Sequence, residues 1–311
     1  MPTEPAVSTA ASRQSQDTLR AILFMALAIN LFPFMNVAAK FLSADYPTVQ
    51  IVWARYAGHL VFVLLMFMPR RGLALLRASR PGVHIGRSLL MFVSTVCFFS
   101  ALRWIEVPTA SAINFTSPLI VTALAAPLLG EVVGIRRWGA VMVGFVGALV
   151  IIRPGGGETH WAMFLILGTA LSYAGYQIAT RKFATADPPE TSITYISFVG
   201  AALASLALPF EWVTPHSIRD ALLFALLGVI GGLGHYFVIR AFQLGEASML
   251  SPFNYGQLIM ATVLSLFVFG TFPDTWTLIG ASVIVASGLY ITYRESRRDV
   301  ALTRDQTASD T

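Results

Sequence analysis

The sequence predicts an all-α polytopic membrane protein with ten transmembrane helices, built as two five-helix repeats of opposite orientation. The first observation is composition: the 311 residues are 56% hydrophobic and only 12% charged, whereas soluble domains have roughly 25% charged residues. The mean hydropathy is +0.69. The second observation is an internal repeat, because two stretches of the chain carry matching residues in the same order.

The repeat is visible as residue pairs separated by a nearly constant offset. The clearest pairs are Ala101 with Ala241, Glu106 with Glu246, Asn114 with Asn254, Phe115 with Tyr255, Gly130 with Gly270, Lys40 with Lys182, and Asp45 with Asp187. Each unit holds an odd number of spans, so the second copy must enter the membrane upside down relative to the first. This inverted duplication is typical of secondary transporters.

Ten apolar runs of about 20 residues, the length that crosses a bilayer, give the helices in order. They lie near residues 20–41, 48–68, 84–103, 108–129, 134–152, 161–182, 190–208, 219–241, 247–269 and 275–293. The two repeats then occupy residues 20–153 and 154–295. Residues 1–19 and 296–311 are rich in Ser, Thr, Ala and charges, and we expect them to form disordered tails.

The basic residues predict the orientation of the helices. If both termini are cytoplasmic, 16 of the 21 Lys and Arg residues fall on the cytoplasmic side, and only Lys40, Arg103, Arg153 and Arg219 lie outside. The positive-inside rule therefore favours cytoplasmic termini. The formal charge of +5 is then explained by topology and by contact with lipid headgroups, and no nucleic-acid partner is expected.

The acidic residues narrow the function classes. All sixteen lie in tails, loops or helix ends, which argues against a proton or sodium relay of intramembrane carboxylates and against most intramembrane hydrolases. The chain has no HExxH, GxSxG or Gly-rich phosphate-loop motif, and Cys97 is its single cysteine. We therefore expect no catalytic residues, no metal site and no cofactor.

Three ionisable side chains are predicted inside the membrane. Arg55 lies about seven residues into the second helix, roughly 10 Å deep at 1.5 Å per residue, and His59 follows one turn later on the same face. Arg55 either binds a substrate carboxylate or braces the bundle. His59 and His235 either pack as neutral rings or carry protons, since their unperturbed pKa lies near neutrality.

The amides Asn114 and Asn254 occupy equivalent positions in the two repeats, with Pro118 and Pro252 nearby. A proline within a span frees a backbone carbonyl, which must find a partner in protein or in a wet cavity. We favour a polar cavity at mid-depth near these residues. The alternative is simple hydrogen bonding between helices.

Further polar groups at mid-span extend this candidate substrate site. They are Asn30 and Asn36 on the first helix, Tyr173, Tyr176 and Gln177 on the sixth, and Tyr255 on the ninth. Aromatic rings with one polar group suit a small amphipathic solute.

The run from Ala110 to Ile152 resembles the EamA repeat of the drug/metabolite transporter superfamily. The matching features are Pro118, the Gly130-Glu131 turn, Trp138-Gly139 and Gly144; the second copy keeps Gly270, Trp276, Gly280 and Gly288 but has Thr271 in place of the glutamate. Arg55 matches an arginine common in the second helix of the family. The resemblance covers about residues 20–293, and it implies ten helices as two inverted repeats around a central cavity, with helices 5 and 10 outside it.

Within the superfamily, the second half of the chain looks most like the YddG-type amino-acid exporters. This resemblance implies a multi-pass protein of the bacterial inner membrane that exports neutral or aromatic amino acids by alternating access. The partners expected are the small-molecule substrate and membrane lipid; the sequence leaves the oligomeric state open, with a monomer as one option. The alternative that it leaves open is an EamA carrier for riboflavin, S-adenosylmethionine, a sugar or a drug, or a channel. Neither tail is long enough to fold as a separate output domain.

Overall fold

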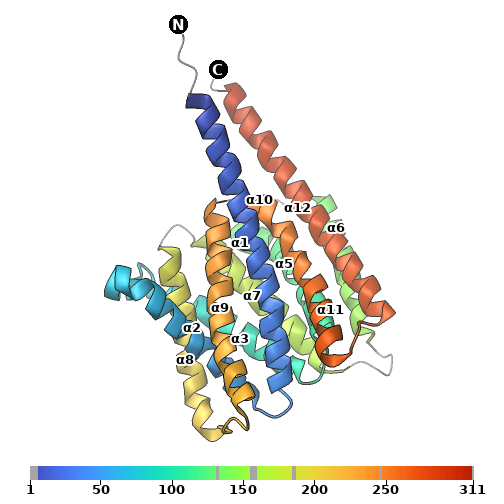
Figure 1. Ribbon diagram of the computed structural model, residues 1–311. Coiled ribbons are helices and arrows are strands. Elements are labelled where there is room, and N and C mark those ends of the chain that lie inside the picture. The colour runs from blue at the N-terminus through green and yellow to red at the C-terminus, as the bar shows by residue number, and fades with distance from the viewer. Residues whose placement is uncertain (1–5, 131–132, 155–159, 184–186, 245–246, 310–311) are drawn as a thin grey trace.

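A computed structural model describes residues 6–130, 133–154, 160–183, 187–244 and 247–309. Over these residues it is helical, with no strand (Figure 1). Ten of its helical segments are long and apolar enough to span a membrane. The first repeat consists of α1 (Ala6–Leu42), α2 (Thr48–Arg71), η1 (Gly72–Leu76), α3 (Pro81–Leu102), α4 (Val107–Asn114), α5 (Ser117–Leu129) and α6 (Ile135–Ile152).

The second repeat runs in the opposite direction. It consists of α7 (Ala162–Lys182), α8 (Pro189–Ala207), η2 (Leu208–Phe210), α9 (Ile218–Leu244), α10 (Ala247–Leu250), η3 (Ser251–Tyr255), α11 (Gly256–Phe269) and α12 (Thr275–Ser309). The start of α1 and the end of α12 lie at the same end of the bundle (Figure 1). We refer to the end that carries η1 and Asp187 as the terminal end, and to the end that carries Tyr46 and Asp274 as the far end.

The fourth and ninth spans are each broken, whereas the sequence predicted continuous helices over 108–129 and 247–269. The helix α4 ends at Asn114 and α5 begins at Ser117. Pro118 has no N–H to bond the carbonyl of Asn114 four residues before it, which explains why the helix stops there. In the other repeat Pro252 lies in the 3-10 turn η3, and the rings of Phe115 and Tyr255 contact each other across the two breaks, with centroids 5.0 Å apart and planes inclined by 43°.

The helices α1 and α12 extend beyond the predicted spans into both terminal segments. The helix α1 already begins at Ala6, and α12 continues to Ser309. Both extensions contain Ala, Arg and Gln, which favour helix. Lengthening an existing helix adds one hydrogen bond per residue fixed without a new nucleation cost, so these segments continue the spans beside them.

The spans form two groups and one separate pair, and both repeats contribute helices to each group. In one group α9 packs against α1 and α2, and α11 packs against α1. In the other group α3 packs against α7 and α8, and α5 packs against α7. The groups meet where α2 contacts α8 and where α4 contacts α11, while α6 and α12 pack against each other along one side (Figure 1).

Two glycines allow α2 and α9 to approach closely. A Cβ at Gly58 would lie 2.7 Å from the Cα of Gly228, a separation that side-chain-bearing residues do not tolerate. Neighbouring Gly231 faces the Arg55 side chain, which would lie 3.8 Å from a Cβ at that position. The close backbone approach therefore brings the polar residues of α2 against α9.

Candidate substrate-binding site

Arg55, His59 and His235 form a buried polar cluster between α2 and α9. Arg55 and His59 are one helical turn apart and are 6% and 2% exposed. The His59 and His235 rings stack with centroids 5.4 Å apart and planes inclined by 4°. The ring of Phe32 on α1 meets the His235 ring in an edge-to-face arrangement, with the ring centroids 5.4 Å apart. The structure thus brings together the three ionisable residues that the sequence predicted within the membrane.

The Arg55 guanidinium crosses from α2 to the other helix group. Its Nη1 donates a hydrogen bond to Thr95 Oγ1 on α3, and its Cζ lies 5.6 Å from the centroid of the Phe99 ring. Tyr56 shares the same threonine, with its hydroxyl 2.9 Å from Thr95 Oγ1. Among the described residues, no ion pair is formed by Arg55. A buried charge without an ionic partner is costly, which favours an anionic ligand.

Several buried polar atoms of this region have no hydrogen-bond partner in the described structure. They include Arg55 Nε, His59 Nε2, His235 Nε2 and Asn114 Oδ1. Leaving a buried polar group unsatisfied costs about 1–3 kcal/mol, so such groups in a folded protein call for an explanation. An arginine and two imidazole nitrogens next to one another can bind the oxygens of one carboxylate.

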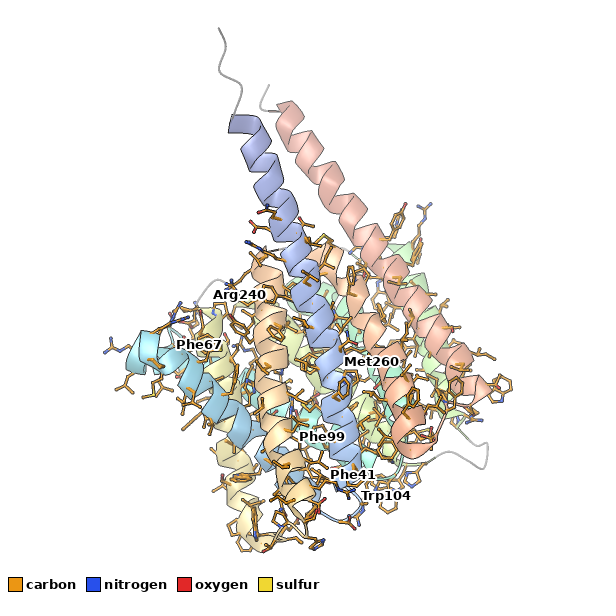
Figure 2. The ribbon with its side chains drawn as sticks, in the orientation of Figure 1. Phe41, Phe67, Phe99, Trp104, Arg240 and Met260 are labelled. Carbon is orange, nitrogen blue, oxygen red and sulfur yellow. The ribbon has the colours of Figure 1, made fainter. Side chains whose placement is uncertain are left out.

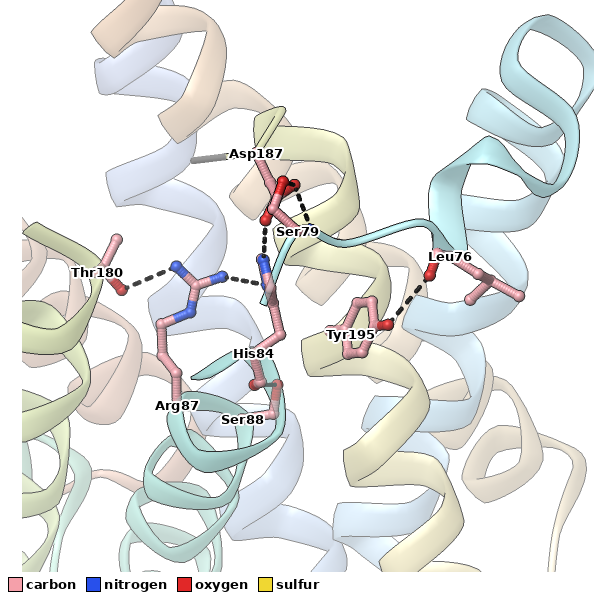
Figure 3. A network of polar contacts seen from close by, with 8 residues as sticks. All are labelled: Leu76, Ser79, His84, Arg87, Ser88, Thr180, Asp187 and Tyr195. Atoms are coloured by element: carbon pink, nitrogen blue, oxygen red, sulfur yellow. Dashed lines mark hydrogen bonds and ion pairs between the residues drawn. The ribbon is translucent and has the colours of Figure 1, made fainter. Parts of the chain in front are cut away.

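A second buried arginine, Arg87, is not among the ionisable residues that the sequence predicted inside the membrane. It lies on α3 and is only 4% exposed. Its guanidinium contacts His84 Nδ1 at 3.0 Å and Thr180 Oγ1 at 3.4 Å (Figure 3), and its Cζ lies 5.8 Å from the centroid of the Tyr176 ring. The signal for burial was present, because Pro81 predicts a helix start that places Arg87 inside the helix.

The two tyrosines on α7 connect the surroundings of the two arginines. The rings of Tyr173 and Tyr176 lie nearly parallel, with centroids 5.8 Å apart and planes inclined by 22°. Tyr176 contacts Arg87, and Tyr173 is within electrostatic range of Arg55. A row of aromatic and cationic groups therefore runs from Arg87 near the terminal end towards Arg55.

Asp187 links the two repeats at the terminal end. It accepts hydrogen bonds from the Ser79 backbone N–H and hydroxyl, both at 2.9 Å, and lies 3.0 Å from His84 Nε2 (Figure 3). Its side chain is 6% exposed. Hydrogen bonds from the Ser79 backbone and from His84 hold the pKa of the Asp187 carboxyl below its usual range. Tyr195 reinforces the link, because its hydroxyl bonds the Leu76 carbonyl at 3.0 Å.

The low pKa of Asp187 predicts an acid-dependent loss of stability. A carboxyl with a lowered folded-state pKa contributes stability above its unfolded pKa of about 3.9, and this contribution is lost as the pH falls through the folded value. We expect Asp187→Asn to lower the thermal unfolding temperature in detergent at pH 7, and the difference from the parent to shrink between pH 4 and pH 3. A difference that stays constant over this range would show that the ionised carboxylate contributes nothing.

The far end is also closed by contacts between the repeats. Tyr46 donates a hydrogen bond to Asp220 at 3.0 Å and accepts one from the His216 backbone at 2.7 Å. Burial raises the pKa of the Tyr46 hydroxyl, so it stays protonated as a donor at neutral pH. Within the first repeat, Lys40 on α1 also donates a hydrogen bond to the carbonyl of Ile105, which follows α3, at 2.9 Å. Contacts across the repeats therefore exist at both ends of the bundle.

The remaining predicted site residues have different surroundings. Asn30 bonds the Ala26 carbonyl of its own helix at 2.7 Å. Tyr255 packs between Phe115 and α12, and its hydroxyl occupies the space that a Cβ at Gly288 would need. Asn36, Gln177 and Asn254 are partly buried.

Glu131 and Glu246, which belong to the repeat motifs, lie outside the described residues. Within the described part, no cluster of His, Cys, Asp or Glu could hold a metal ion.

Comparison with known proteins identifies transporter relatives. An S-adenosylmethionine uptake transporter of Rickettsia prowazekii is 30% identical over 280 residues, which are 90% of this chain and 94% of the relative. A riboflavin transporter of Vibrio cholerae is 29% identical over 90% of this chain and 95% of its own. A pseudopaline exporter of Pseudomonas aeruginosa is 28% identical over 86% and 93%. One crystal structure superimposes with a TM-score of 0.64 over 89% of this chain and 98% of its own; at 21% identity this concerns the fold alone.

These relatives change one expectation from the sequence. None of the three is named as an amino-acid exporter, so they do not support the resemblance to the YddG-type exporters. That resemblance rests on residues 247–274, a span and the turn after it, which contain no motif that specifies a substrate. The family model of EamA-like transporters matches residues 19–153 and 160–293, so this chain is a multi-pass membrane protein that belongs to the EamA-like transporter family.

Proposed function

We propose that this protein carries a small metabolite with an amino-acid group, with S-adenosylmethionine as the first candidate. The observation that carries the proposal is the cluster of Arg55, His59 and His235: one buried nitrogen of each (Nε, Nε2 and Nε2) has no hydrogen-bond partner, and Arg55 forms no ion pair among the described residues. A substrate carboxylate satisfies them. The name of the relative from Rickettsia prowazekii supports the choice of S-adenosylmethionine, which has such a carboxylate.

The other parts of the substrate find matching groups nearby. The nearly parallel rings of Tyr173 and Tyr176 suit a planar base, and electron-rich rings also attract a sulfonium cation. The free Oδ1 of Asn114 accepts a hydrogen bond from the substrate ammonium, and α4 packs against α7, which carries the tyrosines. A neutral or aromatic amino acid would use the same carboxylate site, which keeps amino-acid transport as the second candidate.

Transport follows from the position of Arg55 between the helix groups. Its guanidinium bonds Thr95 of α3, so this hydrogen bond connects α2 to α3. A substrate carboxylate competes for the same guanidinium and loosens this tie. Contacts between the groups also occur at both ends: Tyr195 of α8 bonds the Leu76 carbonyl after α2 at the terminal end, and Lys40 of α1 bonds the Ile105 carbonyl after α3 at the far end. Rocking of one group against the other, with these contacts broken in turn, would expose the site to each side alternately.

We place the protein in a bacterial inner membrane with its terminal end in the cytoplasm. The support is the excess of Lys and Arg on that side, 16 of 21 in the chain, by the positive-inside rule. A single cysteine introduced at Gly72 in a Cys97→Ala background should be shielded from impermeant thiol reagents in intact cells. Rapid labelling there would reverse the orientation.

Counterflow in proteoliposomes tests the substrate. We expect internal S-adenosylmethionine to drive accumulation of labelled S-adenosylmethionine without an imposed ion gradient, since no carboxylate relay lies within the described spans. S-adenosylhomocysteine, which keeps the amino-acid group, should compete, whereas adenosine, which lacks it, should not. Competition by adenosine alone, or counterflow of riboflavin without S-adenosylmethionine, would contradict the carboxylate site as the basis of recognition.

A further inference from the structure

A basic pocket lies away from the Arg55 cluster, at the terminal end of α2, α8 and α9. Its volume is about 270 Å³, and its charged lining consists of Arg70, Arg71 and Arg240 with one acid, Glu190. Phe67 and Tyr236 also line it, with ring centroids 6.2 Å apart. Figure 2 shows Phe67 on the projecting end of α2 and Arg240 near the end of α9. No residue of α3 or α7 lines it, which separates it from the row of groups between Arg87 and Arg55.

The charges of the pocket are incompletely paired. Arg71 bonds Glu190 at 3.3 Å, and Arg240 bonds Gln243 at 3.1 Å. Three guanidinium groups against one carboxylate leave two positive charges. Arg240 Nε and Glu190 Oε2 are buried without a partner in the described structure. The pocket therefore offers donors for an anion together with one acceptor for a hydroxyl group.

The surroundings of the pocket indicate where that anion comes from. Leu64, Leu65 and Met68 on the preceding turns of α2 are exposed, Leu65 by 74%, as expected for a surface that faces acyl chains. Arg70 and Arg71 follow them at the end of the span, where the chain leaves the apolar layer. Basic pockets between transmembrane helices at this level bind the headgroups of anionic lipids.

We propose that this pocket binds the phosphate of an anionic phospholipid, with Arg71 and Arg240 on the phosphate oxygens and Glu190 accepting from a headgroup hydroxyl. The acyl chains lie along Leu64, Leu65 and Met68. The lipid would occupy the place where α2 of one helix group meets α8 of the other. The inference does not depend on which metabolite the protein carries.

Native mass spectrometry and thermal unfolding of the purified full-length protein test this. Phosphatidylglycerol should form a one-to-one adduct and raise the unfolding temperature by several degrees more than phosphatidylcholine with the same acyl chains. Arg240→Gln and Arg71→Gln should each lose at least half of this difference. Arg136→Gln removes an exposed arginine at the start of α6, outside the pocket, and should keep it.

Two results would overturn the proposal. One is an undiminished phosphatidylglycerol effect in both pocket variants, each compared with its own unfolding temperature without lipid so that a general loss of stability is separated from lost binding. The other is an equal effect of inorganic phosphate at the same concentration, which would make the pocket a small-anion site.

Discussion

Replacing Arg55 by lysine is expected to reduce transport about 10- to 100-fold while the protein stays folded. Arginine can hold both oxygens of a carboxylate through its planar fork, and lysine reproduces this geometry poorly. Hydrogen bonds to charged groups contribute about 1.5–3 kcal/mol, and each 1.4 kcal/mol is a factor of ten. Initial rates of counterflow with equal amounts of reconstituted protein measure the effect.

The matched control is Arg219→Lys, because Arg219 also lies on a helix of the same group but its side chain is 69% exposed. This variant should transport at the parent rate. If Arg55→Lys matches the parent in both transport rate and unfolding temperature, Arg55 is a structural residue that only braces α2 against Thr95, and the proposed substrate site is wrong.

Gly228→Val is expected to have the largest effect on stability. The helices α2 and α9 approach so closely here that a Cβ on Gly228 would lie 2.7 Å from the backbone carbonyl carbon of Gly58. The valine side chain would therefore collide with the backbone of Gly58. Backbone atoms cannot move aside as a flexible side chain can, so overpacking should cost at least the 1–3 kcal/mol typical of such changes. The helices must separate, which also pulls His235 away from His59.

Gly86→Ala is the matched control, since a Cβ on this helical glycine would meet nothing within 4 Å. It should stabilise α3 slightly, by up to about 1 kcal/mol, because alanine favours helix over glycine. Thermal unfolding in detergent measures both variants. If Gly228→Val unfolds at the parent temperature, the close contact between α2 and α9 is not present in the protein.

The sequence predicted the fold class because both of its signals, the length of the apolar runs and the internal repeat, can be read from the residue order without knowledge of the packing. Span length follows from apolar runs, and opposite orientation follows from a duplication with an odd number of spans. The break after Asn114 was not predicted, although Pro118 was noted, because a proline four residues on can bend a helix or end it. The helical extension of α1 and α12 was not predicted because the composition of these segments is polar, and polarity alone does not decide between coil and helix.

The candidate site could be predicted only in part. Arg55 and His59 share a face because they are four residues apart on one helix, but the stacking of His59 with His235 depends on α2 packing against α9, which no local pattern encodes. Tyr255 was expected to line the site, and the structure places it against Phe115 and Gly288 because the broken helices bring these elements together. Arg87 was missed because its neighbours in sequence are the basic residues of a loop.

Determining the structure with S-adenosylmethionine bound tests the central claim most directly. The account predicts that the substrate carboxylate lies within hydrogen-bonding distance of Arg55 and of at least one of His59 and His235, and that the bond between Arg55 and Thr95 is broken. A substrate bound elsewhere in the bundle, with Arg55 still on Thr95 and the two histidines unchanged, would contradict it.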